Sequence, residues 1–95
     1  MTTPTPYRYS RHPDLRVTAL AGEGVVLHLG TRRYYTVSES GLLILEALAK
    51  PSTEAELVAA VLDHYAVDLD QATRSVTAFL ARCRATGFLV EHKGP

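Results

Sequence analysis

Few residues of this chain could do chemistry: it has one cysteine and four histidines. Cys83 would serve as a nucleophile only with a base within hydrogen-bond reach and with access to solvent. It falls instead on an apolar helical stripe, which predicts a buried structural thiol. The spacings of His12, His28, His64 and His92 match no metal-ligand pattern. A single cysteine also excludes an internal disulfide. We therefore expect no metal site and no cofactor.

The remaining candidates for chemistry have structural explanations. Gly22-Glu23-Gly24 is a lone G-x-G between two predicted strands, and because no helix follows it, it predicts a hairpin turn rather than a phosphate-binding loop. The carboxylate pairs Glu54/Glu56 and Asp68/Asp70 stand at predicted helix starts, where they complement the helix dipole. The inventory therefore indicates a protein that is not an enzyme.

Length and charge narrow the choice further. With 95 residues, 46% of them apolar, the chain suits one compact domain and is too short for two. Ten Lys+Arg balance ten Asp+Glu, whereas nucleic-acid binders usually carry a basic excess. No apolar run approaches the ~20 residues that span a bilayer, and the start of the chain lacks the pattern of a signal peptide. We expect a cytoplasmic protein with no nucleic-acid partner and no membrane partner.

The elements that must position any site begin after a predicted tail. Residues 1–14 contain three prolines and no periodicity, which indicates a tail, with the domain over residues 15–92. Residues 16–20 alternate polar and apolar, and residues 25–29 and 33–37 are rich in β-branched or aromatic side chains. Because the connecting turns are short, these three strands predict an antiparallel meander.

Three helices follow, each with a recognisable start. Ser38 is a good N-cap, Thr53 opens a capping box with Glu56, and Asp68 caps a third helix that runs to about residue 86 and stops at Gly87. The third helix carries an apolar stripe: Leu69, Ala72, Val76, Phe79, Leu80 and Cys83. The predicted fold class is α+β, a three-stranded antiparallel sheet followed by three helices, in an arrangement like a winged helix-turn-helix.

Such a fold leaves two kinds of binding open. The strand over residues 33–37 is an edge without blunting features, so that another chain could pair with it. A winged-helix DNA-binding regulator is the alternative, with Arg32 and Arg33 on the wing and further arginines on the third helix: Arg74, Arg82 and Arg84. That helix also carries Asp68 and Asp70, and the net charge is zero, which disfavours DNA because affinity rests mainly on phosphate neutralisation.

Several runs of residues, in their order, resemble the coenzyme PQQ synthesis protein D (PqqD) family. The runs are residues 24–27, 33–41, 44–48, 65–68, 76–80 and 86–89. The resemblance covers roughly residues 15–91 and implies a precursor-peptide recognition element from the biosynthesis of ribosomally made, post-translationally modified peptides. The chain looks most like the stand-alone leader-binding proteins of lasso-peptide clusters, and a PQQ-type peptide chaperone for a radical enzyme is the other possibility within the family.

The resemblance also implies a mode of binding and the partners. The leader segment of a precursor peptide adds as an antiparallel strand to residues 33–37, in the groove against the third helix. The complex then delivers the precursor to a separate leader peptidase, and a cyclase closes the ring. Ser75 departs from the family, in which an acidic residue is common at this position.

The candidate peptide-binding residues come from this strand and this helix. Backbone groups at the edge give affinity, so specificity must come from side chains. Tyr35 and Val37 are expected to face inward, toward core and groove. We choose the Phe79 flank of the helix over the flank with Thr77 and Arg84, because a half-exposed aromatic residue suits an anchor pocket. The predicted set is Arg33, Tyr34, Tyr35, Thr36, Val37, Ser75, Val76, Phe79, Leu80, Arg82 and Cys83.

Overall fold

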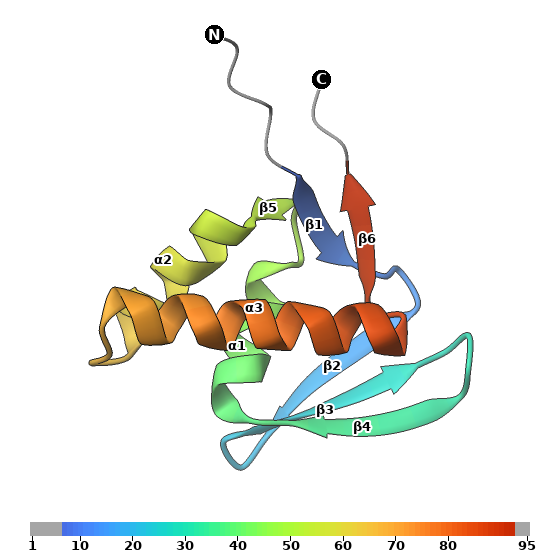
Figure 1. Ribbon diagram of the computed structural model, residues 1–95. Helices are drawn as coiled ribbons and strands as arrows, with labels where there is room; N and C mark the ends of the chain where they lie inside the picture. The colour runs from blue at the N-terminus through green and yellow to red at the C-terminus, as the bar shows by residue number, and fades with distance from the viewer. Residues whose placement is uncertain (1–6, 93–95) are drawn as a thin grey trace, which may run out of the picture.

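Two small antiparallel sheets pack with three helices in the computed structural model, which describes residues 7–92 (Figure 1). The mixed α+β class, with an antiparallel three-stranded sheet and three helices, is confirmed. The elements in chain order are β1 (Arg8–Arg11), β2 (Leu15–Leu20), β3 (Glu23–His28), β4 (Arg33–Val37), α1 (Glu39–Ala47), β5 (Ser52–Thr53), α2 (Glu54–His64), α3 (Leu69–Thr86) and β6 (Leu89–His92).

The larger sheet has the order β2-β3-β4, as the meander predicts. A tight turn joins β2 to β3, and both Ala21 (φ 52°) and Gly22 (φ 83°) adopt the left-handed conformation there. Positive φ at both central residues suits a two-residue hairpin, because such turns follow the right-handed twist of the strands. Gly24 of β3 lies opposite Val37 of β4 in the register. This order leaves β4 at one edge of the sheet.

The smaller sheet corrects two predictions. Its order is β5-β1-β6, so the structure has a second sheet in addition to the predicted one. Residues 8–11, predicted to be part of a tail, form β1 and pair with β6 from Arg8↔His92 to Arg11↔Leu89. The tail prediction is wrong here because the partner strand lies about eighty positions away, and local periodicity does not signal such a pairing. The rest of the predicted tail before residue 7 lies outside the described residues.

The predicted helix starts and the final stop are confirmed. Ser38 caps α1, and Thr53 and Glu56 form a complete capping box at α2, with 3.1 Å from the Glu56 amide to Thr53 Oγ1 and 2.8 Å from the Thr53 amide to Glu56 Oε1. Asp68 caps α3, and Gly87 ends it in the left-handed conformation. These signals are local hydrogen bonds to otherwise unpaired backbone groups, which is why the sequence reveals them.

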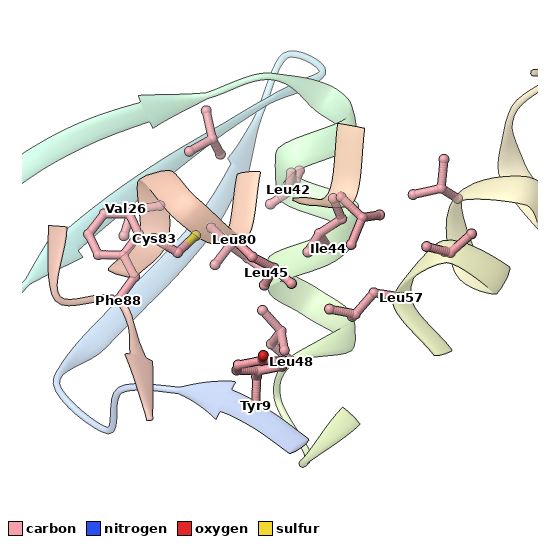
Figure 2. Packing of buried hydrophobic residues seen from close by; sticks show 14 of the residues in the cluster. Tyr9, Val26, Leu42, Ile44, Leu45, Leu48, Leu57, Leu80, Cys83 and Phe88 are labelled. Carbon is pink, nitrogen blue, oxygen red and sulfur yellow. The ribbon is translucent and has the colours of Figure 1, made fainter. Parts of the chain in front are cut away.

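The hydrophobic core is built around α1, which packs against the larger sheet and against α2. Figure 2 shows Leu42, Ile44, Leu45 and Leu48 along α1, with Leu80 of α3 packed near them. Other members of the buried cluster are Tyr9, Leu15, Val26, Val37, Leu57, Val58, Val61, Ala72, Val76, Cys83 and Phe88. The core therefore ties both sheets and all three helices together.

The long helix α3 is amphipathic, with Ala72, Val76, Leu80 and Cys83 buried on one face. The predicted apolar stripe is correct except at its start, where Leu69 is 64% exposed. Leu69 stands in the first turn of α3 and is not part of the buried cluster. Within residues 7–92, no helix has both the length and the apolar character that a membrane crossing requires.

Candidate functional site

The outer edge of β4 is the most prominent feature for binding. Within the described chain β4 pairs with β3 alone, so the other side of its backbone has no strand partner (Figure 1). Val37 is buried and Tyr35 half-buried, while Tyr34 and Thr36 are exposed, Tyr34 by 71%. This alternation agrees with the inward facing expected for Tyr35 and Val37. An edge of this kind offers unpaired N–H and C=O groups to an incoming strand.

A pocket of about 270 Å³ lies between β4 and α3. Its lining is mainly apolar or aromatic on the side of the core, with Arg82 as the charged member: Tyr35, Thr36, Val37, Phe79, Arg82, Cys83, Thr86 and Phe88. The inward side chains of β4 thus form one wall, and α3 forms the other. A strand added to β4 would place its own inward side chains over this pocket.

A second pocket of about 400 Å³ continues along α3 toward α1 and the α2–α3 connection. Its lining is Ser38, Ser40, Gly41, Ile44, Val61, Tyr65, Val67, Gln71, Ser75, Ala78, Phe79 and Arg82. Phe79 and Arg82 line both pockets and therefore stand where the two meet. We call the two pockets together the β4–α3 groove.

Residues 23–89 match the family model described as Coenzyme PQQ synthesis protein D (PqqD). The chain belongs to the PqqD family. The matched region takes in both walls of the β4–α3 groove and leaves out β1 and β2. The family resemblance expected from the sequence is therefore confirmed.

Two solved structures are similar to this PqqD-family chain. TbiB1, solved in complex with the TbiA(beta) leader peptide, is 25% identical, with a TM-score of 0.75 over 84% of this chain and 93% of the other. A lasso peptide synthetase B1 complexed with the leader peptide is 18% identical, with a TM-score of 0.73 over 86% of this chain and 96% of the other. At that identity the second likeness concerns the fold alone. A search of the curated proteins found no match.

A buried histidine, His28, lies next to Phe88 of the groove lining and joins two elements of the fold. The Gly30 amide donates to His28 Nδ1 at 3.1 Å, so His28 Nε2 carries the proton and donates to the Gly87 carbonyl at 3.2 Å. The His28 ring packs on Phe88 at 6.4 Å, and Phe88 meets Tyr35 edge-on at 4.9 Å between centroids. This PqqD-family chain thereby connects the end of β3 to the end of α3.

Cys83 is a lining residue of the groove and yet only 1% exposed. Burial raises the pKa of the Cys83 thiol to about 12, against the smaller opposing effect of the charges on Arg82 and Arg84. Since the thiolate is the nucleophilic form, this environment disfavours a reactive cysteine. Cys83 packs as an apolar residue beside Phe88 and Val26 (Figure 2).

We expect Cys83 to resist alkylation in the folded protein. Because its pKa lies well above 8 and its sulfur is buried, iodoacetamide at pH 8 should modify it at least about a hundredfold more slowly than in urea. Mass spectrometry against time measures both rates on the same sample. Equal rates in the native and the unfolded state would show an accessible thiol and reopen a catalytic role.

The predicted site residues separate into three groups. Seven line the groove: Tyr35, Thr36, Val37, Ser75, Phe79, Arg82 and Cys83. Arg33 and Tyr34 belong to β4 but line neither pocket. Val76 and Leu80 belong to the buried core cluster, 0% and 1% exposed, and also line neither pocket.

On the opposite flank of α3, two polar side chains are hydrogen-bonded to other elements of the chain. Thr77 Oγ1 donates to Glu54 Oε1 of α2 at 2.7 Å. Arg84 Nε donates to Glu91 Oε1 of β6 at 2.9 Å, and Arg84 Nη2 donates to the Tyr9 hydroxyl at 2.9 Å. The Phe79 flank is the one that borders the groove.

Sequence reasoning missed several lining residues, among them Gln71 and Ala78 on α3, whereas it predicted their neighbours Ser75 and Arg82. Gln71, Ser75, Ala78 and Arg82 follow one another at steps of four, three and four, and so form one ridge beside the apolar stripe. Short side chains in that ridge leave room for the larger pocket. The helical spacing could have revealed this ridge, whereas Tyr65 and Val67, which come from the α2–α3 connection, could be placed only by the fold.

Proposed function

We propose that this PqqD-family chain binds the leader segment of a ribosomally made precursor peptide, with lasso-peptide precursors as the substrate class. The leader pairs as an antiparallel strand with β4, and its inward side chains enter the β4–α3 groove. One observation carries the proposal: β4, which pairs with β3 alone among residues 7–92, lies directly beside the pocket that it forms with α3.

The division between affinity and specificity follows from this geometry. Backbone hydrogen bonds to β4 hold a strand of any sequence, while pockets select alternate side chains. Successive inward side chains of a strand stand about 7 Å apart. The two pockets meet at Phe79 and Arg82, so neighbouring inward side chains of the leader can fill them in turn.

The similarity to TbiB1 supports the substrate class. TbiB1 was solved with a leader peptide, and the likeness covers 93% of its length at 25% identity. The similar part of this chain is therefore large enough to include both walls of the groove. The proposal takes the kind of ligand from that protein and the contact residues from the groove of this one.

We infer that leader removal and ring closure belong to separate partners, a leader peptidase and a cyclase. Among the described residues, the one thiol of the groove is buried and protonated, and no histidine, carboxylate or lysine lines the groove to activate its hydroxyl groups. A protein that binds without cleaving presents the precursor to enzymes that cleave and cyclise.

A backbone amide NMR titration tests the proposal, with a candidate leader peptide taken from a neighbouring short reading frame as the probe. Shifts should concentrate at residues 33–37 and 71–86, and amide exchange should slow at alternate residues of β4. We expect micromolar to nanomolar affinity, about −8 to −12 kcal/mol. No shifts with this leader, together with salt-sensitive shifts from duplex DNA at the arginines of α3, would favour the winged-helix alternative.

A further inference from the structure

We propose that Arg82 selects an acidic residue in the bound peptide, within two positions of an apolar residue that fills the pocket beside β4. This inference rests on the proposed function and adds a rule for the sequence of the ligand. It rests on the position of the Arg82 guanidinium and on the fact that this group has no partner among the residues that the structure describes.

Arg82 stands at the centre of the groove. It lines the pocket beside β4 and also the pocket toward α1, together with Phe79. The residue as a whole is exposed, so a ligand can reach it. A peptide that occupies either pocket passes Arg82.

The charge of Arg82 has no partner among residues 7–92. Its side chain makes no ion pair and no hydrogen bond there, whereas the other two arginines of α3 each form an ion pair. Arg74 pairs with Asp70 at 3.2 Å, and Arg84 pairs with Glu91 at 2.9 Å. No aspartate or glutamate lines either pocket. The described groove therefore carries one positive charge and no negative charge.

A carboxylate is the group that a strand can best bring to this position. The planar guanidinium donates two parallel hydrogen bonds to a carboxylate, a stronger and more directional contact than one with an amide. A bound peptide that covers Arg82 would exclude water from the pair and so strengthen it. Inward side chains recur at every second residue of a strand. An acidic residue beside Arg82 thus lies within two positions of the residue seated in the apolar pocket over Tyr35, Val37 and Phe79.

A displayed library of random peptides tests the rule and does not require the natural leader. The library is selected against the parent protein, against Arg82→Glu and against Arg74→Gln, a matched control on the same helix whose ion pair lies outside the groove. The parent and the control should enrich Asp or Glu within two positions of an aromatic or aliphatic residue. Arg82→Glu should enrich Lys or Arg at the same position.

One selected peptide then gives the pairwise effect. Replacing its acidic residue by the corresponding amide should weaken binding to the parent about tenfold, and binding to Arg82→Gln less than twofold, as measured by calorimetry. An equal loss with both proteins, or enrichment without acidic bias, would overturn the role of Arg82 while leaving peptide binding intact. If the folded parent enriches no peptide, the proposed function fails as well, so the two failures are distinguishable.

Discussion

Phe79→Ala is expected to leave the protein folded and to weaken leader binding about 30-fold or more, the range of a central aromatic anchor. Phe79 is half-buried and lines both pockets, so that its ring forms the wall between them. Removing the ring merges the pockets and takes away apolar surface that the leader would cover. Calorimetry with the leader of the NMR titration measures the change.

Two further variants show whether the loss comes from the groove. Leu69→Ala also removes an apolar side chain from α3, but Leu69 lines neither pocket of the groove, so affinity should stay within twofold. Gly41→Ala keeps Phe79 and displaces it, because a Cβ at residue 41 would lie 2.8 Å from Phe79 Cε1. That variant should weaken binding as well. If folded Phe79→Ala binds the leader as tightly as the parent, the peptide does not use this flank of α3.

The parts of the fold that could be predicted are those that local chemistry decides. Ser38, Thr53 and Asp68 mark helix starts because each caps amides a few residues ahead. The meander is visible because its turns are short and its strands alternate. The pairing of β1 with β6 joins residues about eighty positions apart, and nothing in the local sequence of either segment indicates its partner.

The candidate site was predicted less completely, for a geometric reason. An apolar stripe on a helix shows which residues avoid water, but it does not separate the floor of a groove from the interior. Phe79 and Leu80 are neighbours on the same stripe, and the structure places the first in the groove and the second in the core. Only the position of β4 and α1 around α3 makes that distinction.

The stability of Leu80→Ala tests whether Leu80 belongs to the core rather than to the groove. Leu80 is 1% exposed and packs near Leu45 in the centre of the core (Figure 2). Its truncation should lower the free energy of unfolding by about 2–5 kcal/mol, since a buried cavity adds to the lost transfer energy. A domain has about 5–15 kcal/mol in total, so the loss is a large share of the stability. Urea unfolding followed by circular dichroism measures it.

Leader affinity should separate Leu80 from Phe79. Because Leu80 lines neither pocket, folded Leu80→Ala at low temperature should bind the leader within about twofold of the parent, in contrast to Phe79→Ala. Exposed Leu69→Ala provides the control for stability, with a change within about 0.5 kcal/mol. The reverse pattern, in which Leu80→Ala keeps its stability and loses affinity for the leader, would show that Leu80 is a binding residue, as the sequence predicted. The pair of variants therefore decides where on α3 the core ends and the groove begins.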